Sequence, residues 1–398
     1  MDFSLSPEIN DLRLRIRAFV DTHIIPLESD PNAYDDHENI AHEPLERLKK
    51  MAKSEGLWSL SLPNEFGGLG LKVAEIAPCY EEMNRSIFGP VCFNASAPDD
   101  GNMRVLAQVA RPDQKEKWLR PIADGDIRSA FVMTEPLPGS GSDPSAMLTK
   151  AEKKGDKWVV NGRKWFITGA EAATHFILMA KTSEDARHGL TAFLFHKDQP
   201  GWRIVRRIPI MGPEEHGGHC ELEFDNMEIP DEDRLMEVGE GLKVTQIRLG
   251  TARLTHCMRW LGLAERSMEI AADYVSKRES FGSTLAQHEG VQWMMGEVAM
   301  GIEVGRLLTM RAATKLDQGD FARKEVSMAK IQVADTLHLA ADTAIQLNGA
   351  RGYSKDTVLE WIYRYARQAR LVDGASEVHK MVLARNFLAE GNDFWSWD

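Results

Sequence analysis

Hydrophobic periodicity changes twice along this chain, and the change predicts an α+β protein. Apolar residues recur at helical spacing from Ser6, in strand-length runs from about Ile127, and at helical spacing again from about Gly239. Three regions follow from this order. They are an N-terminal α-helical domain at residues 1–126, a middle β domain at 127–236 and a C-terminal α-helical domain at 237–398.

The middle region should form a barrel or sandwich. Asn161-Gly162, between two of its apolar runs, is a strong signal for a two-residue hairpin turn. The expected strands contain residues 130–133, 157–160, 165–168, 176–179, 190–195 and 221–224. In the last region, long helical patterns with short connections favour a four-helix bundle. The expected helices cover residues 242–279, 286–317, 324–348, 358–371 and 377–388.

Charge and composition narrow the range of functions. A net charge of -12 argues against general nucleic-acid binding, because phosphate recognition needs clustered Lys and Arg. The four Cys residues contain no CxxC pair, which suggests neither disulfides nor a zinc site. The cluster of His216, His219 and Cys220 lacks an evident fourth ligand, so we expect no metal. No leader pattern or membrane-length apolar run is visible, and we expect a cytoplasmic protein without membrane insertion.

The pair Asp373-Gly374 lies between two expected helical segments, residues 362–370 and 377–388. Gly supplies the backbone freedom that such a junction needs. A carboxylate wedged between packed helices would have its pKa raised by desolvation, as a general base for a weak carbon acid requires. The alternative is that Asp373 is only a helix-end residue and Ser376 an N-cap, with no chemistry.

This junction and the segments described next resemble the acyl-CoA dehydrogenase family. In that family a carboxylate followed by Gly abstracts the substrate α-proton, and most members have Glu at this position. Asp373-Gly374, with Glu377-Val378-His379 after it, is similar to the branch that contains family members ten and eleven. The resemblance covers nearly the whole chain. It implies the family's fold with a helical, a β and a four-helix-bundle domain, bound FAD and an acyl-CoA substrate.

A first flavin-binding segment is implied at residues 131–143. Met-Thr-Glu-Pro at 133–136, followed by Gly-Ser-Asp at 141–143, looks like the family signature that holds the flavin ring and lines the thioester pocket. Small residues let backbone N–H groups approach a ligand. The loop at 137–140 is longer than usual in the family, which could displace Ser142 from its role. The implied flavin contacts are Phe131, Met133, Thr134, Gly141 and Ser142.

The strand Lys164-Trp165-Phe166-Ile167-Thr168 resembles a second flavin-binding segment. Phe166 falls where an aromatic ring stacks on the isoalloxazine, and Thr168 where a hydroxyl meets the flavin edge. Trp165 stands one residue early. Because successive strand residues face opposite sides, either Phe166 faces the flavin or the register has moved. The alternative is an ordinary core aromatic.

Residues 278–282, Arg-Glu-Ser-Phe-Gly, are similar to the family segment that crosses to a neighbouring subunit and binds the pyrophosphate and adenine of FAD. Arg suits this role because its planar fork pairs with two phosphate oxygens. The resemblance implies contacts from Arg278, Phe281, Leu285 and His288. His288 could equally be an interface residue with satisfied hydrogen bonds.

Gln346 and Gly349 resemble a further segment that meets the same FAD from another chain, although the next Gly of the family pattern is Ala350 here. The implied FAD site is built across subunits, with the Arg278 and Gln346 segments supplied by different chains. A monomer could not complete it. The resemblance therefore implies a homo-oligomer, either a dimer or a tetramer.

The resemblance also implies the reaction. Asp373 would remove the α-proton of the thioester while the β-hydrogen leaves as hydride to the flavin, and electrons would pass to an electron-transfer flavoprotein. Some members carry their catalytic Glu just before the Arg that corresponds to Arg253, but Ala252 stands there and offers no other base. The implied substrate contacts are Ser142, Arg253, Asp373 and Gly374.

Asp is one methylene shorter than Glu. Either the backbone lies closer to the substrate α-carbon, or the pocket favours a branched or substituted acyl group. Other functions also fit the sequence. They are a flavin oxidase or monooxygenase of the same fold, a non-catalytic relative that binds flavin or CoA, and a structural helical protein that would purify colourless.

Overall fold

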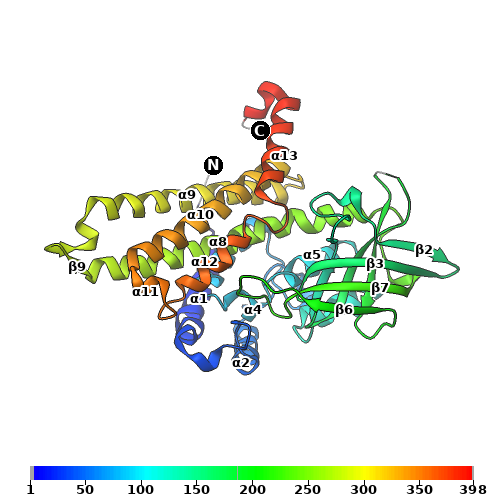
Figure 1. Cartoon of the computed structure of the whole chain (residues 1–398), viewed down its shortest axis with the longest axis horizontal. Helices are drawn as coiled ribbons and strands as arrows, with labels where there is room; N and C mark the ends of the chain where they lie inside the picture. The colour runs from blue at the N-terminus through cyan, green and yellow to red at the C-terminus, as the bar shows by residue number, and fades with distance from the viewer. Residues whose placement is uncertain (1–3, 186, 397–398) are drawn as a thin grey trace.

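The computed structural model describes residues 4–185 and 187–396. Met1 to Phe3, which begin the stretch without a leader pattern, lie outside these residues. Figure 1 shows an elongated molecule with a helical bundle at one end and a β sheet at the other. Within the described residues, no helix is both long enough and apolar enough to cross a membrane.

The N-terminal region is helical, as the periodicity predicts. Leu45, Leu48 and Ala52 are buried on one face of the second helix, at the spacing that places side chains on one stripe. The helices are α1 Pro7–Phe19, α2 His42–Ser54, α3 Val73–Met83, α4 Gly89–Cys92, α5 Asp99–Val109, α6 Pro112–Gln114 and α7 Arg120–Ala123.

The middle region forms a mainly antiparallel sheet. Seven of its strands pair in the order β6-β7-β3-β2-β4-β5-β8, and β1 pairs with β4 in parallel. The strands are β1 Arg128–Val132, β2 Lys150–Lys154, β3 Lys157–Thr168, β4 Ala173–Lys181, β5 Leu190–His196, β6 Trp202–Arg207, β7 His219–Pro230 and β8 Arg234–Leu235. The sequence did not reveal β2 or β6, because their charged, half-exposed faces carry no apolar run.

The expected hairpin turn at Asn161-Gly162 is wrong. β3 continues through these residues and pairs with β7 on both sides of a bulge. Gly162 has φ +152°, and a Cβ built there would lie 2.5 Å from Thr149 Oγ1, so Gly allows a close approach within the sheet. The turn lies earlier, at Gly155-Asp156 between β2 and β3, where Gly155 has φ +65°.

The C-terminal region is helical with bounds close to the expected ones. Its helices are α8 Gly241–Lys277, α9 Glu289–Asp317, α10 Arg323–Asn348, α11 Ala350–Tyr353, α12 Leu359–Gln368 and α13 Ser376–Glu390. A short hairpin of β9 Glu279–Ser280 and β10 Ser283–Thr284 joins α8 to α9. In Figure 1, α8, α9, α10 and α12 lie together, whereas α13 projects from them.

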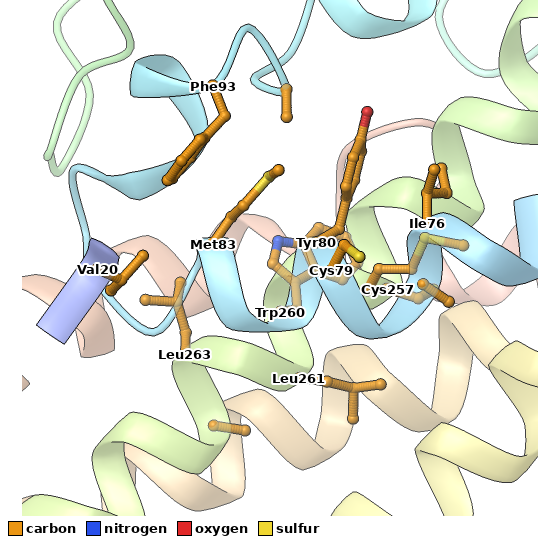
Figure 2. Packing of buried hydrophobic residues seen from close by; sticks show 14 of the residues in the cluster. Val20, Ile76, Cys79, Tyr80, Met83, Phe93, Cys257, Trp260, Leu261 and Leu263 are labelled. Atoms are coloured by element: carbon orange, nitrogen blue, oxygen red, sulfur yellow. The ribbon is translucent and has the colours of Figure 1, made fainter. Parts of the chain in front are cut away.

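One hydrophobic core joins the two helical regions. α3 packs against α8, and Figure 2 shows Tyr80 and Cys79 of α3 near Trp260 of α8. The buried Tyr80 hydroxyl donates a hydrogen bond to Asp100 Oδ1 over 2.9 Å, which ties α3 to α5. The N-terminal helices therefore hold α8 in a fixed place, and α8 carries much of the site described next.

Candidate active site

Asp373 faces a cleft of about 580 Å³ where all three regions meet. Thr168 enters the cleft from the end of β3, Gly101 from α5, and Arg248 and His256 from α8. The cleft thus combines a carboxylate with residues from the sheet and from both helical regions. The structure brings together two of the residues predicted from sequence, Asp373 and Thr168, which are 205 positions apart by their numbers in the chain.

The backbone at Asp373 is left-handed. Asp373 has φ +51° and Gly374 has φ +103°, so two successive residues occupy a region that Gly favours. Arg253 Nε donates to the carbonyl oxygen of Asp373 over 2.7 Å, and Lys330 Nζ donates to that of Gly374 over 2.8 Å. These two cations hold the junction in place. Arg253 therefore contacts the backbone of the expected base.

The amide N–H of Asp373 makes no hydrogen bond to any of the residues that the structure describes. It is available as a donor beside the carboxylate. The helix that follows begins differently from the sequence expectation, because Ala375 is its N-cap residue and Ser376 is its first residue. The buried Ser376 hydroxyl has no partner among the described residues, so it does not act as the predicted cap.

The charge state of Asp373 also differs from the expectation. Burial raises the pKa of this carboxyl, but the hydrogen bond from His256 and the charges of Arg248 and Arg253 oppose burial and win. They hold the pKa of Asp373 well below its usual range. The expected rise in pKa is wrong because the neighbouring cations come from α8, which is far away in sequence.

A buried ion pair organises the first expected flavin-binding segment. Lys164 Nζ lies 3.0 Å from Glu135 Oε1 and also donates to the carbonyl oxygen of Met133 over 2.8 Å. The Glu135 carboxylate accepts backbone N–H groups of Leu148 and Thr149 over 2.7 and 2.8 Å. The loop between β1 and β2 is thereby wrapped around one carboxylate.

The tip of this loop carries Gly141 and Ser142, which are both exposed. The described residues that line the Asp373 cleft do not include either of them. The longer loop therefore leaves Ser142 outside the cleft, and its predicted substrate contact stays a prediction. Thr134, before the loop, accepts the N–H of Trp165 at its carbonyl oxygen over 2.9 Å, which joins the two expected flavin-binding segments.

Phe131 links the sheet to α8. The guanidinium of Arg248 lies 4.2 Å from the centre of the Phe131 ring, and its Nε donates to Asn102 Oδ1 over 2.9 Å. Arg248 is buried, and burial lowers its pKa. A cation–π contact of this kind stabilises a buried cation. The half-buried Phe131 therefore fixes Arg248 at the wall of the cleft.

A bulge decides which way the second flavin-binding segment faces. The pairing of β3 with β7 shifts between Lys164 and Ile167, and Phe166 has φ +49° with 45% of its surface exposed. Simple alternation fails here, because the bulge turns the Phe166 ring outward. Thr168 follows, with Oγ1 3.1 Å from His219 Nδ1, and lines the cleft.

The Arg278 segment lies at the other end of the bundle (Figure 1). Arg278 is the C-cap of α8, and Phe281 at the tip of the hairpin is 98% exposed with φ +53°. His288 Nε2 lies 3.2 Å from the Ser280 carbonyl oxygen and 3.2 Å from Ser283 Oγ. His288 therefore has hydrogen bonds within the hairpin, as the alternative interpretation expects.

The Gln346 segment belongs to this same end. Leu285 packs on a small core that contains Ala344 and Leu347, and Gln346 and Gly349 lie beside these residues at the end of α10. The expectation that the Arg278 and Gln346 segments come from different chains is therefore wrong. One chain places them together, because the ends of α8 and α10 share an apolar contact.

The two predicted halves of the cofactor site are far apart in one chain. Arg253 and Arg278 are on the same helix and its cap, roughly 38 Å apart at 1.5 Å per residue. A single FAD cannot reach from the Asp373 cleft to Arg278 of the same chain. The residues fit FAD only if the half with Phe131, Thr168 and Asp373 meets the Arg278 half of a second copy.

Sequence reasoning missed His256, Arg248 and Lys330. The first two lie with Ala252 on the cleft side of α8, at spacings of four and eight residues, which the helical period could have revealed. Lys330 is buried on α10 and carries no local signal. The His216, His219 and Cys220 cluster gives no group of three metal-binding side chains, and none is present elsewhere in residues 4–185 and 187–396.

The fold and the cleft together define a class: a helical, sheet and helical protein with a carboxylate at the junction of all three parts. Family models for the acyl-CoA dehydrogenase N-terminal, middle and C-terminal domains match residues 6–126, 130–227 and 239–388. The chain belongs to the acyl-CoA dehydrogenase family, a family of FAD-dependent oxidoreductases.

Individual relatives agree with this assignment. Acyl-CoA dehydrogenase family member 11 of Gallus gallus is 37% identical over 96% of this chain, which spans about half (51%) of that relative. FadE2 of Mycobacterium tuberculosis, named as an acyl-CoA dehydrogenase, is 38% identical over 97% of this chain and 96% of its own. A solved structure from Mycobacterium abscessus, described as an acyl-CoA dehydrogenase, has 36% identity and a TM-score of 0.91, covering 98% of this chain and 100% of its own.

Proposed function

We propose that this protein catalyses the α,β-dehydrogenation of an acyl-CoA thioester to the trans-2-enoyl-CoA, with Asp373 as the base. The observation that carries the proposal is the pairing of the Asp373 carboxylate with its own unbonded N–H at the wall of one cleft. A base beside a fixed donor is what removal of a proton next to a thioester carbonyl requires. The family assignment supports the same reaction class.

The backbone of the junction supports the donor role. Arg253 and Lys330 hold the carbonyl groups of Asp373 and Gly374, which lie in the two peptide groups that follow the Asp373 N–H. The backbone next to this donor is therefore held before substrate arrives, and a held donor needs little reorganisation as negative charge grows on the thioester oxygen. Arg253 and Gly374 act in substrate binding through this support.

The low pKa of Asp373 is compatible with its role as a base. The carboxyl is ionised throughout the neutral range, so no proton has to leave it before the reaction. An acyl chain that fills the cleft removes water from the carboxylate, and desolvation disfavours the charged form. Substrate binding therefore raises the basicity of Asp373 when the base is needed.

FAD completes the proposed site and, when bound, supplies the hydride acceptor that side chains cannot provide. One chain holds its ring end with the residues around β1 and β3. The second copy holds its phosphates and adenine with the hairpin end of the bundle. The ring-end residues are Phe131, Met133, Thr134, Gly141, Ser142, Phe166 and Thr168. The partner end comprises Arg278, Phe281, Leu285, His288, Gln346 and Gly349.

An exposed apolar stripe on α9 supports the proposed oligomer. Trp293 is 71% exposed and Met300 is 65% exposed, and Val304 and Leu307 continue the same face of the helix. Large exposed apolar patches mark interaction surfaces. This stripe follows directly after the hairpin, so a second copy that covers it also approaches Arg278.

We propose a dimer or tetramer, with an electron-transfer flavoprotein as electron acceptor and a cytoplasmic location.

An anaerobic titration of the purified protein with a panel of acyl-CoAs tests the function. We expect a yellow protein with about one FAD per chain, whose flavin absorbance bleaches with at least one acyl-CoA as enoyl-CoA forms. Binding of acyl-CoA without bleaching across the panel would show a non-catalytic relative. Rapid reoxidation of the reduced flavin in air would instead indicate an oxidase.

A further inference from the structure

His256 lies against Asp373 and has no role in the function proposed so far. Its Nε2 atom is 3.4 Å from Asp373 Oδ2. The imidazole stacks on Trp260, with ring centres 5.0 Å apart and 25° between the planes. Because both residues belong to α8, one turn apart, the helix itself sets the position of the ring.

His256 is the nearest cation-forming side chain to the carboxylate. Within residues 4–185 and 187–396, no other Lys, Arg or His nitrogen lies within 4.0 Å of the Asp373 carboxylate oxygens. Arg253 and Lys330, although close, donate to backbone carbonyl groups instead. The carboxylate is therefore aimed by the imidazole.

The hydrogen bonding assigns the proton of the ring. Nδ1 of His256 is buried and has no partner in the described part of the chain, whereas Nε2 faces an anion. A neutral imidazole with its hydrogen on Nε2 satisfies the carboxylate, and the position of that hydrogen is inferred from these contacts. Burial lowers the pKa of His256, which keeps the ring neutral and a donor.

Other charged groups surround His256 and Asp373 from every element packed against them, and their charges also influence both residues. They are Arg248, Arg253 and Arg259 on α8, Asp100 on α5, Glu215 in the loop before β7, His219 on β7, Lys330 on α10 and His379 on α13. Arg248 and Arg253 act on the Asp373 carboxyl group through their charge, without a hydrogen bond to it.

We propose that His256 is a positioning residue that donates a hydrogen bond from Nε2 to Asp373 and so keeps the base ionised and aimed into the cleft. This inference rests on the proposed function, because it takes Asp373 as the base. Without the donor, burial would dominate the carboxyl group and protonate it at a higher pH. The bare carboxylate would also be free to rotate.

Two substitutions separate the donor from the ring. His256→Phe keeps a ring to stack on Trp260 but removes both nitrogens. His256→Gln removes the ring but places an amide N–H close to the position of Nε2. The measurement is the rate of anaerobic flavin reduction from pH 5 to pH 9, with an acyl-CoA that bleaches the wild type, and with FAD content and thermal melting as folding controls.

For the wild type and for His256→Gln, we expect the rate of flavin reduction to stay constant as the pH falls from 7 to 5. For His256→Phe the rate should fall toward low pH, because burial that no hydrogen bond opposes raises the pKa of a carboxyl by up to about 3–5 units and so brings the acidic limb into the measured range. An unchanged limb in His256→Phe would overturn the proposal, as would equal shifts in both variants. A wild type that no acyl-CoA bleaches would instead refute the proposed function.

If His256→Phe does not fold, His256→Asn replaces it. Its amide lies near the position of Nδ1 and is one methylene too short to reach Asp373, so it forms a matched pair with His256→Gln. We then expect the acidic limb of the pH–rate profile to move to higher pH in His256→Asn and to stay unchanged in His256→Gln. Identical profiles for the two amides would overturn the proposal.

Discussion

At Asp373 two physical effects oppose each other, and the balance decides the chemistry. Burial favours the neutral acid, whereas His256, Arg248 and Arg253 favour the carboxylate. The second effect wins, so the group is a permanently ionised base whose strength depends on water leaving the cleft. The N–H of Asp373 makes no hydrogen bond within the described residues, so the carboxylate and an unbonded donor belong to the same residue.

Substitution of Asp373 tests the base. Asp373→Asn keeps the shape but cannot take a proton, so acyl-CoA should bind normally while flavin reduction slows by roughly 10²–10⁴-fold. Asp373→Glu should misplace the carboxylate, and an error of about 1 Å costs on the order of 10²-fold. Stopped-flow reduction measures both. Asp356→Asn, at an exposed carboxylate, is the control and should react normally. Near-normal reduction by Asp373→Asn would make the residue a helix-end group only.

At the level of elements, β3 organises the sheet side of the site. Its bulge turns Phe166 outward, and Lys164 on the same strand anchors the loop between β1 and β2 through Glu135. Burial lowers the pKa of Lys164 to about 8, although the charge of Glu135 opposes this. Removing the carboxylate partner of a buried ammonium is strongly destabilising, because the positive charge is then buried without a partner. The loop that carries Gly141 and Ser142 therefore depends on this pair.

Glu135→Gln should destabilise the protein by about 3–5 kcal/mol near neutral pH, since it leaves Lys164 charged and unpaired. Without Glu135 the pKa of Lys164 falls further below 8, so the folded protein releases this proton at a lower pH than the unfolded chain. Stability rises with pH where the unfolded chain binds more protons. The difference in the free energy of unfolding between the wild type and Glu135→Gln should therefore shrink from pH 6 to pH 9. Denaturant unfolding curves measure this difference.

A matched exposed pair on the same strand is the control for this prediction. Lys157 Nζ lies 2.8 Å from Glu228 Oε2, with both side chains about half exposed. Glu228→Gln should leave the free energy of unfolding nearly unchanged, because solvent screens such pairs. If Glu135→Gln lowers the free energy of unfolding as little as Glu228→Gln does, the buried pair does not hold the loop. A loss of stability that grows with pH would show the same.

For the whole molecule, the decisive feature is the length of α8. It carries Arg248 and His256 at the cleft and ends just before Arg278, so the two proposed halves of the FAD site lie at opposite ends of one helix. A symmetric pair of chains would complete two FAD sites at once. The exposed stripe with Trp293 and Met300 next to the hairpin gives the surface on which the copies would meet.

Mixed oligomers test this arrangement. Arg278→Ala should weaken FAD binding, because a charge-assisted hydrogen bond contributes about 1.5–3 kcal/mol. Alone, Arg278→Ala chains should hold FAD weakly and Asp373→Asn chains should reduce it slowly, because every site in either protein carries the substitution. Co-expressed, they form dimers in which one site has a native Asp373 and a native Arg278. Random pairing should restore about a quarter of the wild-type rate.

Two differently tagged chains allow the mixed dimer to be purified and assayed for acyl-CoA-dependent flavin reduction. Failure to regain activity in the purified mixed dimer would place the whole FAD site within one chain. A wild-type protein that sediments as a flavin-loaded monomer would contradict the shared site in the same way.

The sequence alone determined the features that rest on local periodicity. The three regions, the long helices and the position of Asp373 between two of them follow from spacing that neighbouring residues impose on each other. The predicted helix at residues 242–279 and the observed α8 Gly241–Lys277 nearly coincide for this reason. Family membership, inferred from short motifs, is also confirmed by the family models.

Tertiary structure decided what depends on partners far away in the chain. The Asn161-Gly162 signal for a turn was overridden by pairing with β7, and the pKa of Asp373 moved opposite to its local expectation because α8 brings His256, Arg248 and Arg253 to it. Strand pairing and electrostatic fields act through space between segments that sequence spacing does not relate. The grouping of the Arg278 and Gln346 segments in one chain was decided in the same way, by an apolar contact between helix ends.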